Sequence, residues 1–411
     1  MQSFPLHFPR ALSVFSIENN LVIFHAHSLR YWALNSMARR IFEGLYRGDT
    51  VDIVAQDVAS AFSFMPMDAL HIVESTISSW HSSGLLLDGD TLEAQMLSNT
   101  TDTPGASIVR HADERTGTVD HLRPASDIPC YDYAIEEVSF RLILEDPLFA
   151  RIHLPLFAQY RTGPVSDDAL CLSLRREEAA YRLCRDGCVI EWTESYDIVS
   201  TKFIQTLVGH VCGLEAYAAV FHGAAVVVGE ALYLFPGKTG SGKSTLAAAL
   251  VCSGFTCIND DTLFARADDE RFFSLPLSIK LRQPSWPLIA PIYPGIDRLP
   301  VTDLPQSAVK FFPAPRLPLQ QLRSGFVLKG IFFPTVVPAA DDTSNGDAEA
   351  ACPRLSATES FVRLLEGATW IAPEPERMGR ILALIERTPA FELRYTTLDQ
   401  ALIMIKDKLR P

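Results

Sequence analysis

The segment 237–244 reads Gly237-Lys238-Thr239-Gly240-Ser241-Gly242-Lys243-Ser244. It fits the pattern G-x-x-x-x-G-K-[ST], which is typical of loops that hold the phosphates of a nucleotide. The residues before it, 231–235, read as a buried strand, and those after it, 244–251, read as a helix. Glycines let backbone N–H groups approach phosphate oxygens, and a helix N-terminus adds the positive end of its dipole. The segment therefore predicts a site for a nucleoside triphosphate.

Two side chains of this segment have defined tasks in such a site. Lys243 would reach the β and γ phosphates, and the hydroxyl of Ser244 would hold Mg²⁺. The expected contacts continue to Thr245, in the first turn of the helix. The sequence thus predicts Mg²⁺ together with the nucleotide.

Length and composition limit the classes of protein to which this chain can belong. The chain has 411 residues, enough for two or three domains. Hydrophobic residues make up 48% and charged residues 21%, which favours a packed core over global disorder. The net charge of −13 argues against nucleic acid as a main partner. The longest apolar run, 224–235, is shorter than a membrane span and contains Glu230, so no membrane partner is expected.

Targeting signals and cysteines both favour a cytoplasmic location. The N-terminus lacks a charged region followed by an apolar one, so no signal peptide is predicted. The eight cysteines form no Cys-x-x-Cys pair. Cys184 and Cys188 flank an expected hairpin turn, where two strand cysteines are a better interpretation than a zinc site. A reducing compartment fits this pattern.

The N-terminal part, residues 1–92, predicts a small winged-helix-like α+β domain. It has two expected strands at 21–24 and 29–33 and a short closing strand at 84–87. Between them, apolar residues at helical spacing predict three helices, at 35–45, 51–62 and 67–81. The next segment, 93–127, is rich in Thr, Asp, Ser and Gly and is interpreted as a flexible linker.

Residues 128–411 predict a second domain in two parts. The first, 128–200, is β-rich, and the second, 201–411, is an α/β nucleotide core. The strands expected in the two parts are 138–142, 169–174, 189–192, 224–228, 231–235, 255–258, 262–265, 271–275, 330–334 and 391–395. The expected helices are 201–220, 244–251, 355–365, 378–385 and 397–409. A polar, alanine-rich insertion separates two of these elements at 338–353.

An acidic pair follows the first strand after the glycine-rich segment. Asp260 and Asp261 lie 17 and 18 residues after Lys243, at the end of the strand expected at 255–258. Such strand ends are where α/β proteins place ligand-binding groups. One carboxylate can bind the metal while the other accepts the proton of an attacking hydroxyl. The alternative is an acidic turn with no catalytic part, and beside a phosphate loop the catalytic interpretation is favoured.

Three further residues are candidates at definite spacings. His222 lies 21 residues before Lys243, at an expected junction of helix and strand. It can contact the γ phosphate or assist the acidic pair, but the residue taken alone favours a core histidine at a helix end. Lys280 and Arg282 alternate on an expected strand, where each can grip a phosphate or remain a solvated edge charge.

Together these residues resemble the catalytic domain of the HPr kinase/phosphorylase family. The match rests on His222-Gly223, the segment 237–244 and Asp260-Asp261, in the same order and at fitting spacings, and is strongest between 221 and 264. The resemblance implies a P-loop kinase core that uses ATP and Mg²⁺ to phosphorylate a serine of a small protein. It implies that Asp260 is the catalytic base and that homo-oligomers form. The arginine-rich C-terminal signature of the sugar-transport enzyme has no match, so neither its reverse reaction nor HPr as substrate is implied.

The N-terminal domain resembles the PqqD family of peptide-binding winged-helix modules. The resemblance rests on Tyr31-Trp32-Ala33-Leu34-Asn35, the helices that follow and Gly84-Leu85-Leu86. Such modules bind the leader of a ribosomally made precursor peptide as an added β-strand. A generic winged helix or a structural cap is the alternative.

The leading hypothesis is therefore an ATP-dependent kinase for a hydroxyl of a captured precursor peptide or small protein. A kinase of a small metabolite or free amino acid, and a nucleotide-binding regulator without catalysis, are the alternatives. The chain has no LSGGQ-like signature and no NKxD motif, which disfavours a transporter ATPase and a regulatory GTPase.

Overall fold

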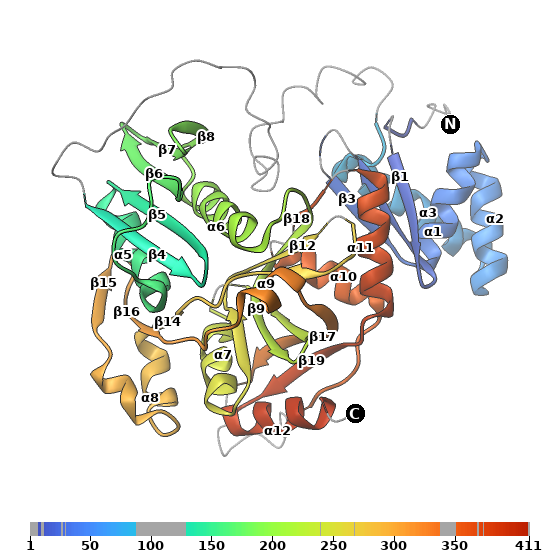
Figure 1. Cartoon of the computed structure of the whole chain (residues 1–411). Helices are drawn as coiled ribbons and strands as arrows, with labels where there is room; N and C mark the ends of the chain where they lie inside the picture. Colours follow the sequence, from blue (N-terminus) through green and yellow to red (C-terminus); the bar gives the residue numbers. More distant parts are fainter. Residues whose placement is uncertain are drawn as a thin grey trace. The chain divides into compact units, whose positions relative to one another are not determined.

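The computed structural model describes residues 7–9, 12–25, 28, 30–87, 129–238, 240–266, 268–337, 351–367, 370–372 and 374–409. The chain is a mixed α/β protein with several sheets, and it divides into two compact units (Figure 1). Unit 1 comprises Met1–Ser107, Ala357–Val362 and Pro373–Arg387, and unit 2 comprises the rest. The expected linker at 93–127, most of the insertion at 338–353, and Thr239 lie outside the described residues.

Unit 1 contains a three-stranded antiparallel sheet and three consecutive helices. The strands follow the order β1 (Leu12–Ile17), β2 (Asn20–His25) and β3 (Arg30–Leu34). The helices are α1 (Ser36–Arg47), α2 (Val51–Phe62) and α3 (Pro66–Ser83). One face of the sheet and the three helices share an apolar core that includes Ile23, Phe42, Val54, Val73 and Trp80.

Polar caps and left-handed residues set the ends of these helices. The side chains of Asn35 and Thr50 accept backbone N–H groups in the first turns of α1 and α2. Left-handed residues, Gly48 and Gly84 among them, end the helices. One expectation was wrong here, and one strand was missed. Residues 84–87 form a turn with a single bridge from Leu87 to His7, and β1, a partly exposed edge strand, was not predicted.

Unit 1 also contains two segments from the C-terminal part of the sequence. Helix α11 (Pro375–Arg387) and the beginning of α10 (Ala357–Glu366) belong to it. Glu18, at the tip of the β1–β2 hairpin, accepts the backbone N–H of Ala357 at 2.9 Å, and Asn20 donates to Thr358 at 2.7 Å. The domain division drawn from the sequence assigned these helices to the nucleotide core.

Unit 2 is built on an eight-stranded sheet with the path β13-β12-β9-β10-β17-β19. Its main strands are β9 (Tyr217–Val228), β10 (Ala231–Pro236), β17 (Val327–Val336) and β19 (Ala390–Tyr395). β9 and β10 form an antiparallel hairpin, whereas β10, β17 and β19 are parallel. On the β9 side the path continues through β12 (Thr262–Arg266) to β13 (Phe272–Phe273), and β11 (Thr256–Asn259) and β18 (Trp370–Ile371) also pair with β9.

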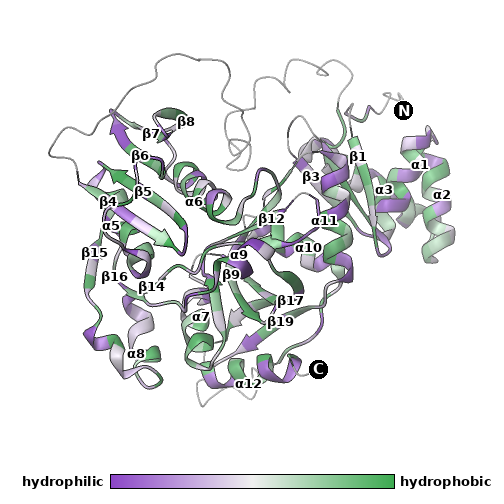
Figure 2. Cartoon of the chain, in the orientation of Figure 1, coloured by the Kyte–Doolittle hydropathy of each residue, from purple (hydrophilic) through white to green (hydrophobic). Residues whose placement is uncertain are grey.

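Helices α7 (Lys243–Cys252) and α12 (Leu398–Lys408) pack against this sheet and each other. The central strands are mostly apolar, whereas polar and apolar residues alternate along the exposed helices, as the colours of β17 and α11 show (Figure 2). None of the helices within the described ranges is long and apolar enough to cross a membrane.

Two smaller sheets complete unit 2. In the five-stranded sheet the strands lie side by side in the order β4 (Cys130–Ile135), β5 (Val138–Leu144), β6 (Leu170–Glu177), β7 (Ala180–Arg185) and β8 (Cys188–Thr193). In the three-stranded sheet they lie in the order β14 (Ile279–Arg282), β16 (Ser307–Phe312) and β15 (Val301–Leu304). Their helical elements are α5 (Pro147–His153), η1 (Leu154–Tyr160), α6 (Tyr196–Cys212), η2 (Gln283–Ser285), α8 (Trp286–Ile289), η3 (Pro294–Arg298) and α9 (Leu319–Ser324).

The helix predicted at 201–220 is shorter than expected. α6 ends at Cys212, and Gly213 then adopts a left-handed conformation with φ +70°. Residues from Tyr217 onward belong to β9, a strand of 12 residues. The prediction failed because 217–221 is a continuous apolar run, which fits a buried strand as well as a buried helix.

Candidate functional site

The glycine-rich loop joins the carboxyl end of β10 to the first turn of α7. Gly242 has φ +86° and is the N-cap of α7, and no side chain caps this helix end. A Cβ atom at Gly237 would lie 2.7 Å from the Ser241 hydroxyl oxygen, so the closely folded loop requires glycine there. The loop therefore presents backbone N–H groups at an uncapped helix N-terminus, which is a suitable environment for an anion.

Lys243 is folded back over this loop. Its Nζ donates to the carbonyl oxygens of Gly237 at 2.5 Å and Lys238 at 3.0 Å, and only 7% of the residue is exposed. Burial lowers the pKa of Lys243, while the charges of Asp261 and Asp260 oppose this change. The ammonium group of Lys243 is thus held at the loop, where the negative charges of Asp260 and Asp261 act on it.

Two hydroxyl groups of the loop and helix differ in their partners. Ser241 Oγ is buried and has no hydrogen-bond partner within the described residues. Thr245 Oγ1, by contrast, lies 2.7 Å from Ser285 Oγ, which ties the first turn of α7 to η2. Ser241 therefore has hydrogen-bonding capacity that the protein itself leaves unused, whereas the hydroxyl of Thr245 already has a protein partner.

The acidic pair lies in the tight turn between β11 and β12. Asn259, at the end of β11, accepts the backbone N–H groups of Asp261 at 2.8 Å and Thr262 at 3.1 Å through its side-chain oxygen. The backbone N–H of Gly223, in β9, donates to the carbonyl oxygen of Asp261 at 2.9 Å. The turn is thus fixed from both sides by groups of unit 2.

Asp260 connects this turn to the glycine-rich loop. Its partly buried carboxyl group is hydrogen-bonded to the side chain of Ser244 and to the backbone N–H of Lys280. Burial, followed by the negative charge of Asp261, raises the pKa of Asp260 to about 6, against the opposing effects of Ser244 and Lys280. The acidic turn and the first turn of α7 are therefore in direct contact.

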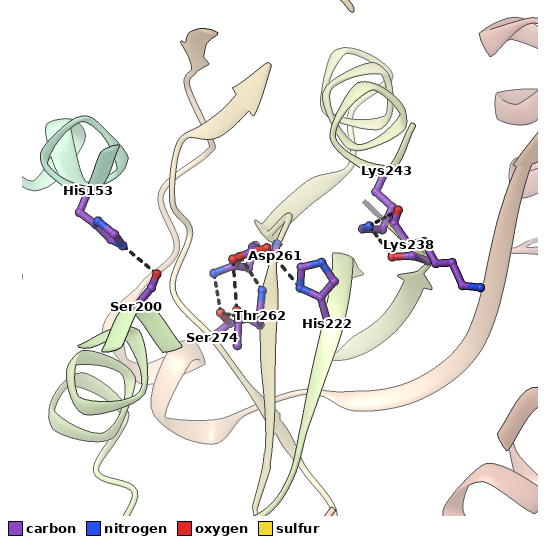
Figure 3. A network of polar contacts seen from close by, with 10 residues as sticks. His153, Ser200, His222, Lys238, Lys243, Asp261, Thr262 and Ser274 are labelled. Atoms are coloured by element: carbon purple, nitrogen blue, oxygen red, sulfur yellow. Dashed lines mark hydrogen bonds and ion pairs between the residues drawn. The ribbon is translucent and has the colours of Figure 1, made fainter. Parts of the chain in front are cut away.

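Asp261 is the more exposed member of the pair and contacts His222. The distance from Asp261 Oδ1 to His222 Nδ1 is 3.2 Å, and 65% of the Asp261 side chain is exposed. Figure 3 shows the two side chains facing each other, with Lys243 and Lys238 on the far side of His222. His222 lies within β9 opposite Thr262, so the expected junction of helix and strand was wrong. His222 therefore reaches the site from the long antiparallel strand β9 and not from the end of a helix.

The two cations on β14 have different surroundings. Lys280 is partly buried, and its charge acts on Asp260. Arg282 is exposed, and its charge acts on Lys243. Both lie on the side of unit 2 that carries the loop and the acidic turn, because β14 also packs against α7.

Three polar residues near the site were not singled out from the sequence. Asn259 and Ser274 bind one another at 2.9 Å beneath the acidic turn. His153 is buried, stacks on Phe149, and lies 3.0 Å from Ser200 Oγ, on the opposite side of the turn from Lys243 (Figure 3). Burial lowers the pKa of His153 to about 3, so this ring is neutral. An asparagine before an acidic turn was the one available signal, because Asn side chains commonly bind the backbone two residues on.

The described residues contain no group of three or more His, Cys, Asp or Glu side chains that would hold a metal by themselves. Of the two cysteines that flank the expected hairpin turn, Cys184 lies in β7 and Cys188 lies in β8. A Mg²⁺ ion that arrives with a nucleotide needs only one or two protein oxygens, since phosphates and water complete its coordination. Ser244 and Asp260 offer such oxygens side by side.

Comparisons with known proteins give little further information. No family model matches the chain, and no curated protein matches it. Among solved structures, it is similar to one described as TbiB1 in complex with the TbiA(beta) leader peptide, with 16% sequence identity and a TM-score of 0.19. That match covers 19% of this chain and 92% of the other. A likeness this slight assigns neither a fold nor an activity.

Proposed function

We propose that this chain is a Mg²⁺- and ATP-dependent phosphotransferase whose acceptor is a hydroxyl group, namely a serine of a ribosomally made peptide. The observation that carries the proposal is the hydrogen bond between Ser244, in the first turn after the glycine-rich loop, and Asp260, in the acidic turn. It brings a helix end suited to phosphates next to a carboxyl group that can take a proton.

The loop supports the nucleotide part of the proposal. The uncapped N-terminus of α7 and the unpaired hydroxyl of Ser241 would receive phosphate oxygens, and Lys243 would exchange its two carbonyl partners for phosphate. ATP, rather than another nucleotide, is taken from the resemblance to the HPr kinase/phosphorylase family. Lys280 and Arg282 would add positive charge on the same side.

Ser244 would hold the metal directly and Asp260 would hold it through water, which leaves the carboxylate of Asp260 free to accept a proton. Bound there, Mg²⁺ would neutralise charge on the phosphates during transfer. The donor set fits this ion, since a hydroxyl and a carboxylate are hard oxygen ligands.

The acidic turn supports the proton transfer. Asp260, with a pKa of about 6, is ionised at neutral pH yet basic enough to accept a proton from a hydroxyl. The oxygen of that hydroxyl would form a bond to the γ phosphorus as the bond to the β-phosphate oxygen breaks, leaving ADP. Asp261, held by His222, would keep the pKa of Asp260 high through its charge.

Unit 1 supports the choice of a peptide acceptor. β3 is the last strand of its sheet, and no other described strand pairs with its outer edge. An open edge is what an added peptide strand requires. The peptide assignment itself is taken from the resemblance of this region to the PqqD family. Capturing a leader there would raise the effective concentration of the acceptor serine.

The direct test is transfer of label from γ-labelled ATP to any serine-containing precursor peptide whose gene lies next to that of this chain. Wild type should label a serine of the peptide, and Asp260→Asn should not. A peptide lacking its leader should be labelled far more slowly. Equal labelling of peptides with and without the leader, or label on a free amino acid or metabolite instead, would refute capture by unit 1. No transfer by folded, ATP-bound wild type to any of these acceptors would refute the kinase.

Truncating the peptide is a cleaner experiment than deleting residues 1–91. α11 and the beginning of α10 belong to unit 1, so this deletion would remove the residues on which they pack. Loss of activity after such a deletion would then not distinguish lost capture from lost folding.

A further inference from the structure

We infer that Asn259 is a positioning residue that fixes the acidic pair in its working geometry, a role that rests on the function proposed above. Asn259 is 2% exposed and lies at the end of β11. Its side-chain oxygen accepts two backbone N–H groups, those of Asp261 and Thr262. Its side-chain nitrogen donates to Ser274 Oγ at 2.9 Å.

The hydrogen-bond pattern requires an amide at this position. The two backbone N–H groups need an acceptor, so the oxygen must face the turn. Ser274 Oγ donates to the carbonyl oxygen of Thr262 at 2.8 Å, so it has only lone pairs left for its other partner. An aspartate would satisfy the turn but would meet Ser274 with a second acceptor, and an alanine would leave the turn unpaired.

The consequence for the site follows from the backbone. The N–H of Asp261 is bound to Asn259, and its carbonyl oxygen is bound to Gly223. The side chain of Asn259 therefore holds the peptide group that joins Asp260 to Asp261, and Gly223 holds the peptide group after Asp261. This arrangement holds the carboxyl group of Asp260 against Ser244. Losing the amide would free the turn and let both carboxylates move.

Three variants test the inference, with turnover, KM for ATP and the thermal melt measured for each. Asn259→Ala should lower kcat by roughly 10- to 100-fold, as expected for misplacement of a catalytic group, with KM for ATP near wild type. Ser274→Ala is the matched control, since it removes a partner of the amide but leaves both bonds to the turn. It should lower kcat by a smaller factor, on the order of fivefold, as expected for one hydrogen bond.

Asn259→Asp tests which property of the side chain matters. Its oxygen can still accept both N–H groups of the turn, but it meets Ser274 Oγ with an acceptor instead of a donor. Its kcat should therefore exceed that of Asn259→Ala, with KM for ATP near wild type, because the bonds to the turn are kept. Wild-type kcat in a folded Asn259→Ala, equal losses in Asn259→Ala and Ser274→Ala, or equal kcat in Asn259→Asp and Asn259→Ala would each overturn the inference. Failure of the proposed function itself would appear separately, as absence of transfer by wild type.

Discussion

The acidic turn and the glycine-rich loop are adjacent in unit 2, but they are stabilised in different ways. In the turn, protein groups pair the backbone and side chains: Asn259, Gly223 and His222 all bind Asp261 or its neighbours. In the loop, α7 has no side-chain cap, Ser241 Oγ is unpaired among the described residues, and Lys243 binds loop carbonyls. The turn is thus organised by the chain itself, whereas the loop has binding capacity that the chain does not fill. Variants in the acidic turn and variants in the glycine-rich loop test these two regions separately.

The largest expected effect is that of Asp260→Asn on phosphoryl transfer. This change removes the proton acceptor and one oxygen proposed for the metal while keeping the shape of the side chain. We expect kcat to fall by about 10²- to 10⁴-fold, measured by label transfer at saturating ATP. Asp269→Asn is the matched control, because Asp269 lies in the β12–β13 hairpin and binds Arg266. Similar activity of the two variants would contradict the proposed role of the turn.

Lys243→Ala tests the loop. Removing the ammonium group takes away positive charge near the transferring phosphate, and we expect a loss of about 10²- to 10³-fold in kcat/KM. Lys329→Ala, at an exposed position of β17, controls for loss of a surface lysine. If Lys243→Ala retained wild-type kinetics, the loop would not be the phosphate site.

Asp261→Asn should shift the pH dependence of kcat. The charge of Asp261 raises the pKa of Asp260, so its removal lowers that pKa from about 6. The acidic limb of the profile should therefore move to lower pH. A limb that stays in place would mean that Asp260 is not the group that titrates.

The smallest effect concerns stability. The pKa of Asp260 is raised in the folded protein from 3.8 to about 6, so between these values the folded state binds more protons than the unfolded state. Stability contributed by the protonated carboxyl is present below pH 4 and is lost as pH rises through 6. At pH 7.5, Asp260→Asn should be more stable than wild type by at most about 3 kcal/mol. Urea unfolding at pH 7.5 and pH 4 tests this, and a stability difference independent of pH would contradict it.

The sequence predicted the parts of the site that local chemistry determines. The strand before the loop, the helix after it, and the turn that carries Asp260 and Asp261 were all located correctly, because their patterns are short and specific. The hairpin of β9 and β10 was located by Gly229-Glu230, which suits a two-residue turn. The activity and the ligands inferred from these patterns stay predictions.

What the sequence did not predict depends on contacts between distant segments. Nothing local shows that α11 packs with β1, or that His222 reaches Asp261 from the middle of a long strand. The hydrogen bond from Asn259 to Ser274 joins two residues that lie 15 positions apart, and it becomes visible only in the folded chain. The end of α6 was misplaced because an apolar run in 217–221 fits helix and strand equally well.

The central claim is that the loop and Asp260 together hold a magnesium-bound nucleotide. Calorimetric titration of ATP, with and without Mg²⁺, tests it most directly in wild type and in Asp260→Asn. Wild type should bind ATP more tightly when Mg²⁺ is present, and Asp260→Asn should lose most of that enhancement while still binding ATP. Folded wild type that binds no ATP, or that binds it equally well with and without Mg²⁺, would contradict the account.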